Sequence, residues 1–314
     1  MKPSPICLLV ALCLLFVPQI SIGAEPYPTK PIKIVVPFPP GGGADTLIRL
    51  LAPTISELWK QSVIVENRPG ASGFIGAELV AQAPADGYTL LMGTTAAVTE
   101  KNIQQFSPVA LVSASPYIVT VNPVLNINSV RGLIAYAKAN PGKLKYGSSG
   151  PGSASHLAGE LFISMANISL LHVPYKGTGQ ALTDLLAGHI DVMFAPAQTV
   201  MPQIDAGKLI ALAQTGVKRS EALPNIPTVA ESGLPGYSAV GWFGLFAPAN
   251  TPKIVLQKIN QTVMFVMGQD RVRKAMLERG SDPASGTAEE FAAFLRSDQS
   301  KWDKLIKDNK FAVQ

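Results

Sequence analysis

Short apolar segments alternate with helical patterns along most of the chain, and this alternation restricts the fold more than any other feature of the sequence. Each apolar run is short and bounded by glycine, proline, asparagine or serine, which is typical of a strand, and most runs are separated by stretches with apolar residues at helical spacing. This order predicts an α/β fold of mainly parallel sheets flanked by helices. Strands are expected at Ile32–Phe38, Ser62–Asn67, Tyr88–Gly93, Pro108–Val112, Tyr117–Asn122, Leu144–Ser149, Leu171–Lys176, Ile190–Ala195, Leu209–Gly216 and Gly241–Pro248.

These strands are too many for one compact unit of this kind, so we expect two domains. The segments Asn122–Asn128 and Gly233–Tyr237 are rich in proline, glycine and asparagine and are the best boundaries. Thr287 and Glu290 form a capping box before the last long helix. If the C-terminal helices pack back on the first domain, the second domain is an insertion. Residues 25–124 and 235–314 then form the first lobe, residues 125–234 form the second, and the chain crosses between them twice, leaving a cleft.

The N-terminus has the features of a secretory signal peptide. Lys2 supplies a positive charge, Ile6–Val17 is an apolar core of suitable length, and Ser21–Glu25 offers small residues for cleavage. We expect residues 1–24 to be removed and the mature protein to be exported to the periplasm. An uncleaved anchor is the alternative, and a lipoprotein is disfavoured by Leu12, a large residue in the place where a small one should stand.

The titratable residues exclude several classes of function. Both cysteines lie inside the predicted signal peptide, so the mature chain would have no disulfide, thiol catalysis or cysteine metal site. The histidines, His156, His172 and His189, have no metal-ligand spacing, and we expect no metal or cofactor. The formal charge is +5 with scattered lysines and arginines, which gives no indication of a nucleic-acid partner.

The stretch Pro37–Asp45 places three prolines and three glycines between a strand and a helix. Ligands of parallel α/β sheets bind beyond the carboxyl ends of the strands, where a helix N-terminus offers free N–H groups to an anion. Small residues at this point let a carboxylate approach the backbone. Asp45 in the first turn serves equally well as a helix cap or as a ligand contact. The stretch matches neither the Walker nor the Gly-x-Gly-x-x-Gly pattern.

Similar junctions recur in both halves of the sequence, which predicts a polar cleft lined by backbone. Asp184 and Lys176 lie near one of them, and a solvated surface position is the plainer interpretation of both. Trp242 and Phe243 are expected in the core or near the hinge. The other junctions contain Ser72–Gly73, Thr94–Thr95, Ser148–Gly150 and Tyr175.

A secreted hydrolase that uses a cleft serine is an alternative function. Ser148, Ser149 and Ser153 lie near His156, although the segment lacks the Gly-x-Ser-x-Gly motif. A nucleophile needs a base within hydrogen-bonding reach, so this hypothesis fails if His156 points away from Ser148 and Ser149.

Six segments of the sequence, in the order in which the family has them, resemble the Bug family. This family comprises the extracytoplasmic solute receptors of tripartite tricarboxylate transporters. The resemblance covers nearly all of the mature chain. It is carried by YPTKPIKIVVPFPPGGGADTLIRLLAP, VENRPGASGFIGAELVAQAPADGYTLLMG, YGSSGPGSASHLAGEL, HVPYKGTGQALTDLLAGHIDVMF, LPNIPTVAESGLPGY and WFGLFAPANTP.

This resemblance implies a periplasmic binding protein with a two-lobed, type II-like fold joined by two hinge crossings, a monomer without catalytic activity. Such a receptor closes on a small carboxylated solute and delivers it to membrane transporter subunits; a receptor that signals to a sensor kinase is the alternative. Two β–α loops, Phe38–Asp45 and Tyr146–Gly152, would hold the carboxylate, and Asp184 falls on the family's recurring aspartate. The implied ligand-binding residues are Phe38, Gly42, Gly43, Asp45, Ser72, Gly73, Thr94, Thr95, Ser148, Ser149, Gly150, Tyr175, Lys176 and Asp184.

The sequence departs from the family pattern after Gly93. Phe106–Val109 arrives about twenty residues earlier than in the pattern, so a loop beside the cleft is shortened. We expect either a larger ligand or a more open pocket, and the contacts of Thr94 and Thr95 depend on this loop.

Overall fold

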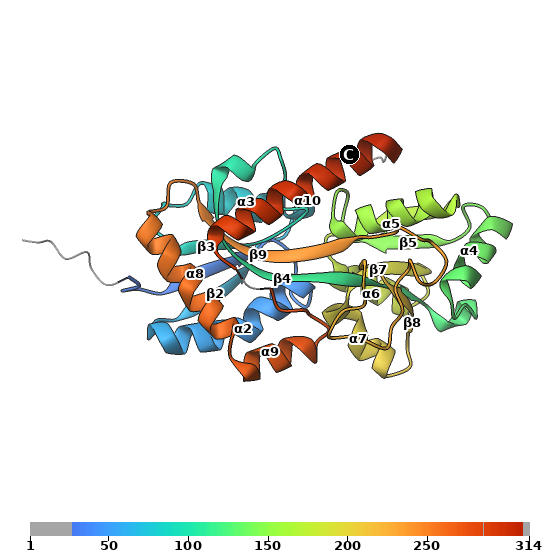
Figure 1. The fold of residues 1–314 in the computed structure, drawn as a ribbon, viewed down its shortest axis with the longest axis horizontal. Helices are drawn as coiled ribbons and strands as arrows, with labels where there is room; N and C mark the ends of the chain where they lie inside the picture. The colour runs from blue at the N-terminus through green and yellow to red at the C-terminus, as the bar shows by residue number, and fades with distance from the viewer. Residues whose placement is uncertain (1–26, 285, 310–314) are drawn as a thin grey trace, which may run out of the picture.

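The computed structural model describes residues 27–284 and 286–309, and its nine strands form one sheet in the order β2-β1-β3-β9-β4-β7-β5-β6, with β8 also paired to β4 (Figure 1). The predicted signal peptide, with Cys7 and Cys13, lies outside the described residues. The strands are β1 Ile32–Val36, β2 Val63–Asn67, β3 Thr89–Thr94, β4 Phe106–Val121, β5 Lys145–Ser148, β6 Leu171–Pro174, β7 Val192–Pro196, β8 Ile210–Gln214 and β9 Val240–Pro248. The α-helices are α2 Gly43–Trp59, α3 Phe74–Ala81, α4 Val130–Ala139, α5 Ala154–Ala166, α6 Thr178–Leu186, α7 Ala197–Asp205, α8 Lys253–Met267, α9 Asp270–Leu277 and α10 Ala288–Asn309.

The strands predicted at Pro108–Val112 and Tyr117–Asn122 are one strand, β4, of 16 residues. Pro116 suggested a break because proline cannot donate to a ladder. In the structure, β4 pairs with β9 up to Pro116 and with β7 from Tyr117 onward. The proline lies where one ladder ends and the other begins, so its missing N–H donor is tolerated. A strand of this length spans about 50 Å and reaches from one lobe into the other.

The sheet is parallel at both ends and antiparallel in the middle. We call the part built on β1, β2 and β3 the first lobe and the part built on β5, β6 and β7 the second lobe. Within each lobe these strands pair in parallel, as the alternation predicts. The antiparallel pairs involve β4, β8 and β9, because the chain leaves the first lobe along β4 and returns along β9 beside it.

Helices cover both faces of the sheet in each lobe. In the first lobe, α2 and α8 bury Leu51 and Val263 on one face, and α3 and α10 bury Val80 and Phe291 on the other. In the second lobe, α5 buries Phe162 on one face, while the other face is covered by α6 and α7. This arrangement leaves the ends of the strands as the place where the two lobes meet.

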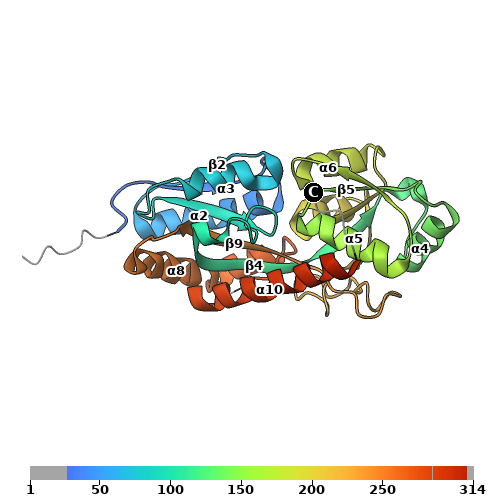
Figure 2. The same cartoon turned by 90° about the horizontal axis from the view of Figure 1, so that it is seen from above.

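Helix α10 is a third connection between the lobes. Its capping box is present, since Glu290 N–H donates to Thr287 Oγ1 at 3.1 Å and Thr287 N–H donates to Glu290 Oε2 at 2.8 Å. Phe291 and Leu295 pack in the first lobe, whereas Trp302 packs in the core of the second. Seen from above, the helix runs along β4 toward α5 (Figure 2). No helix within residues 27–284 and 286–309 combines the length and apolar character that a membrane span requires.

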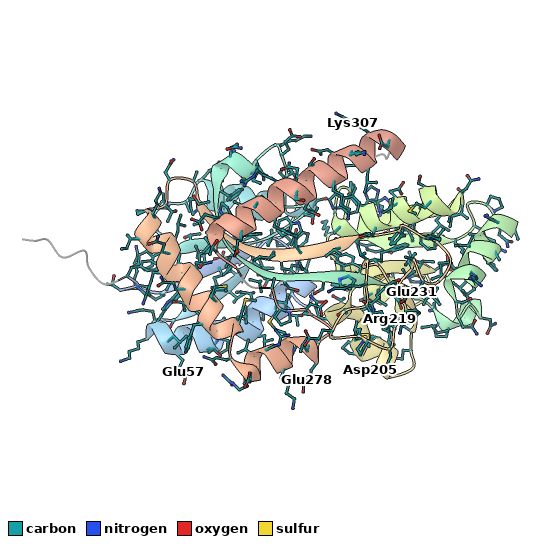
Figure 3. The ribbon with its side chains drawn as sticks, viewed as in Figure 1. Glu57, Asp205, Arg219, Glu231, Glu278 and Lys307 are labelled. Atoms are coloured by element: carbon teal, nitrogen blue, oxygen red, sulfur yellow. The ribbon has the colours of Figure 1, made fainter. Side chains whose placement is uncertain are left out.

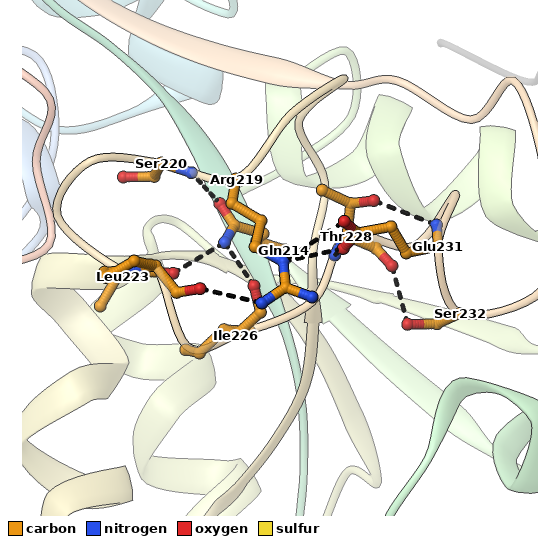
Figure 4. Close-up of polar contacts among 9 residues, drawn as sticks. Gln214, Arg219, Ser220, Leu223, Ile226, Thr228, Glu231 and Ser232 are labelled. Atoms are coloured by element: carbon orange, nitrogen blue, oxygen red, sulfur yellow. Dashed lines mark hydrogen bonds and ion pairs between the residues drawn. The ribbon is translucent and has the colours of Figure 1, made fainter.

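The return from β8 to β9 is held by the buried side chain of Gln214 (Figure 4). Its amide nitrogen donates to the carbonyl oxygens of Leu223 and Ile226, at 2.9 and 2.6 Å, and its oxygen accepts from the Ser220 N–H at 2.7 Å. At the other end of the loop Glu231 caps the turn by accepting from the Thr228 N–H at 2.7 Å. A single side chain therefore fixes three points of a connection without regular structure.

Candidate functional site

A narrow cavity of about 40 Å³ lies between the lobes at the carboxyl ends of the strands. It is the place predicted for a ligand of parallel α/β sheets. The lining residues are Phe38, Pro39, Gly42, Gly43, Ala44, Thr94, Thr95, Ala96, Tyr117, Ser149, Ser153, Ala154, Gly177, Thr178, Pro196 and Phe243.

Four helices begin at this cavity, one from the first lobe and three from the second. The first residues of α2, α5 and α6, and the residue before α7, belong to its lining. The N-termini of α2, α6 and α7 have no side-chain cap, so their first-turn N–H groups have no such partner. Helix N-termini carry partial positive charge and bind anions through free N–H groups. The four helices therefore direct positive potential toward one point.

No charged side chain contributes to the lining of this cavity in the part of the chain that the structure describes. Charged groups such as Glu57, Asp205, Glu278 and Lys307 lie at the periphery instead (Figure 3). An anion in the cavity would consequently be balanced by backbone dipoles and hydroxyl groups, without an ion pair.

Glycines allow the lobes to approach closely at the cavity. A Cβ atom on Gly43 would lie 2.9 Å from Gln198 Nε2 and 3.2 Å from Pro196 Cβ, both in the second lobe. A Cβ on Gly42 would lie 3.4 Å from Thr178 Oγ1. The glycine-rich stretch after β1 is thus packed against the starts of α6 and α7.

Glycines of the second lobe likewise lie close to side chains of the first lobe. Gly150 has a φ of 116°, and a Cβ there would lie 2.5 Å from Ser72 Oγ of the first lobe. A Cβ on Gly177 would lie 2.9 Å from Pro39 Cδ. Both lobes therefore have glycines where they touch, which explains why the sequence places many glycines just after the strands.

Asp45 holds the first loop in place. Its Oδ2 accepts from the Gly41 N–H at 3.0 Å, and its Oδ1 accepts from Arg49 and Asn67, both at 2.9 Å. The side chain is buried, and both of its oxygens have partners in the protein. The capping interpretation of Asp45 fits this geometry.

The structure brings together only some of the residues implied as ligand contacts. Phe38, Gly42, Gly43, Thr94, Thr95 and Ser149 line the cavity. Asp45, Ser72, Gly73, Ser148, Gly150, Tyr175, Lys176 and Asp184 are not among its lining residues. Several of these support the lining: Gly73 lies beneath the ring of Phe38, and Gly150 faces Ser72.

Asp184 and Lys176 occupy more exposed positions. The Asp184 carboxylate accepts from the Tyr175 hydroxyl at 2.6 Å and lies 3.4 Å from His189 Nδ1. The hydrogen bond from Tyr175, followed by that from His189, lowers the pKa of this carboxyl. Lys176 is exposed, and its N–H donates to Gln180 at 3.3 Å.

In the part of the chain that the structure describes, His156 is not the hydrogen-bonding partner of Ser148 or Ser149 that the hydrolase hypothesis requires. Ser148 is fully buried, and its Oγ lies 2.6 Å from His172 Nε2, not from His156. His156 Nδ1 instead accepts from the Gly152 N–H at 3.1 Å. Ser149 Oγ contacts Ser155 Oγ at 3.1 Å, and no hydrogen bond joins it to a histidine among the described residues. The serines form a network that shapes the loop before α5.

His156 and His172 stack with their ring centroids 4.3 Å apart, near Glu160. Burial lowers the pKa of each imidazole to about 4, and for His172 the neighbouring His156 adds to the effect. Between pH 6.5 and 4 the unfolded chain binds protons that the folded protein does not, so the free energy of unfolding decreases as the pH falls.

We therefore expect urea unfolding to show a loss of stability from pH 6.5 to 4 that is smaller in a His156→Gln/His172→Gln variant. The difference is at most about 1.4 kcal/mol per pH unit for each histidine, and less for the half-buried His172 because solvent screens it. Equal pH dependence in both proteins would contradict this account.

Ten of the lining residues were not predicted as ligand contacts, among them Tyr117, Pro196 and Phe243. Pro196 ends β7 and could have been found, because it stands at a carboxyl strand end like the other candidates. Phe243 was expected in the core or near the hinge, and it both packs in a core and reaches the cavity. Tyr117 has no local signal, since its position depends on the partner change of β4.

The sequence profile described as the tripartite tricarboxylate transporter family receptor, TctC, matches residues 47–311. The chain belongs to the TctC family. BugT of Bordetella pertussis is 33% identical to it over 91% of each chain. Two solved structures from R. palustris are also similar. Rpa4515 with adipate is 35% identical, with a TM-score of 0.88 over 90% of this chain and 98% of the other. MatC with bound malate is 28% identical, with a TM-score of 0.83 over 89% of this chain and 100% of the other.

Membership of the TctC family confirms the two-lobed periplasmic-binding-protein fold and the assignment as a solute-binding receptor. TctC proteins are receptors and not enzymes, so the hydrolase alternative is not supported, in agreement with the buried Ser148.

Proposed function

We propose that this TctC receptor captures a small carboxylated solute whose carboxylate enters the cavity between its lobes. The observation that carries the proposal is the convergence of four helix N-termini on a cavity without charged side chains. Adipate and malate, held by the two structural relatives, are carboxylates of the kind that such a site would accept.

Capture proceeds by closure of the lobes about the strands that join them. Most of residues 25–124 and 235–314 move as one unit. Residues 125–234 form the other unit, together with the end of α10 around Trp302, which packs in their core. A carboxylate first meets the N–H groups after β1, and the second lobe then adds the starts of α5, α6 and α7. Hydrogen bonds to a charge shielded from water contribute about 1.5–3 kcal/mol each. Several of them, offset by ordering of hinge and ligand, give affinity near micromolar, about −8 kcal/mol.

The receptor works in the periplasm after removal of residues 1–24, as a monomer. Its closed form is recognised by the membrane subunits of a tripartite transporter, which receive the solute. Membership of the TctC family supports this partner.

The test is calorimetric titration with adipate and with adipamide, which has the same length but no charge. We expect adipate to bind with micromolar affinity and adipamide to bind at least about 100-fold more weakly, since the helix N-termini stabilise charge. Equal affinity for the two compounds would refute an anion site.

A further inference from the structure

A second cavity, of about 280 Å³, lies against the first beneath α10. The two cavities meet at Thr95 and Ala96, which line both. The remaining lining residues are Phe74, Val98, Thr99, Glu100, Lys101, Ile103, Pro151, Gly152, Leu157, Trp242, Leu295, Asp298, Gln299, Trp302, Asp303 and Ile306.

Both lobes and α10 contribute walls to the second cavity. The segment after β3 provides Thr95–Ile103, the loop before α5 provides Pro151 and Gly152, and α10 provides one side. The cavity therefore lies on the same interface that closes around a solute. Its walls would come together in the same movement as those of the first cavity.

The chemistry of this cavity differs from that of the first. Trp242, Trp302 and Leu295 give it apolar walls, and the indole N–H of Trp242 donates to Asp298 Oδ2 at 2.8 Å. The hydroxyl groups of Thr95 and Thr99 are buried without a hydrogen-bond partner among the described residues. A molecule in the cavity thus meets mainly apolar surface, with two free hydroxyl groups and with charged side chains at other points of the walls, namely Glu100, Lys101, Asp298 and Asp303.

Size separates the roles of the two cavities. The first has room for about one water-sized group, since a water takes up about 30 Å³ in the liquid. An apolar cavity of about 150 Å³ accepts benzene, and the second cavity is larger than that. A carboxylate head fits the first, and a solute body fits only the second.

We propose that the second cavity holds the apolar body of the solute whose carboxylate occupies the first cavity. The inference rests on the proposed function and narrows it to carboxylates that carry an apolar body, such as an alkyl chain or a phenyl ring. Thr95 lines both cavities, so its hydroxyl group would contact the solute near the bond between the carboxylate and the apolar body.

The experiment compares 3-phenylpropionate with succinate by calorimetry on the mature protein. We expect 3-phenylpropionate to bind at least about tenfold more tightly and to change the emission of the tryptophans, because two of them line the cavity. Gln299→Phe on α10 and Thr99→Phe on the segment after β3 fill the cavity and should each lower the affinity ratio between the two acids at least about tenfold. Ala293→Phe, at an exposed position of α10, should leave the ratio unchanged.

The outcomes separate the two proposals. If succinate binds and 3-phenylpropionate does not, or if the filled variants keep the wild-type ratio, the second cavity is no part of the site, although the carboxylate site stands. If neither acid nor adipate binds, both proposals are wrong. Circular dichroism and melting temperature establish that each variant is folded.

Discussion

Gly42→Val is expected to abolish adipate binding while leaving the protein folded. The backbone at Gly42 has a φ of −79° and a ψ of 170°, which any residue adopts, so valine brings no backbone strain. A Cβ there lies 3.4 Å from Thr178 Oγ1 in the other lobe, and the two further methyl groups of valine fill a cavity of only about 40 Å³. We expect the affinity for adipate to fall at least about 100-fold, which is roughly 2.7 kcal/mol.

Gly42→Ala is the matched control for this variant. Its single methyl group meets its nearest neighbours at 3.4 and 3.8 Å, which are ordinary contacts. Alanine should therefore keep adipate affinity within about tenfold of the wild type. Calorimetry measures both variants, and urea unfolding reports their stability. A valine variant that binds like the alanine variant would show that the loop after β1 is not where the carboxylate is held.

The place of the site was predictable from sequence because its signals are local. A strand followed by proline, glycine and a helical pattern specifies a helix N-terminus at a sheet edge, whatever the rest of the chain does. The Phe38–Asp45 junction needed no tertiary information, and Gly42 and Gly43 do line the cavity. Export and the lobe boundaries remain predictions.

What the sequence could not predict depends on contacts between distant segments. The continuity of β4 through Pro116 is possible only because β9 pairs with it up to this proline and β7 and β8 pair with it beyond. The partner of Ser148 is His172, one strand away, because β5 and β6 pair in parallel. Asp45 had two equal interpretations until the positions of Arg49 and Asn67 were known. No spacing along the chain encodes these relations.

Gln214→Leu is expected to destabilise the protein by about 2–4 kcal/mol. The side chain of Gln214 is fully buried, and its amide satisfies the carbonyl groups of Leu223 and Ile226 and the N–H of Ser220. Leucine fills a similar volume but leaves the Ile226 carbonyl and the Ser220 N–H without this partner, whereas the Leu223 carbonyl still accepts from the Ile226 N–H at 3.2 Å. Each unsatisfied group shielded from water costs about 1–3 kcal/mol. The loop can relax toward solvent and recover part of the loss, so we expect the lower part of the summed range.

Gln198→Leu is the same substitution in a buried glutamine whose amide makes no hydrogen bond within the described residues. Removing a buried polar group without partners leaves no other group unsatisfied, so its stability should change by less than about 1 kcal/mol or increase. Urea unfolding of both variants isolates the Gln214 network from the general effect of exchanging amide for leucine. If the two variants lose equal stability, the connection between β8 and β9 is held by its apolar packing, and the hydrogen bonds of Gln214 contribute little to the fold.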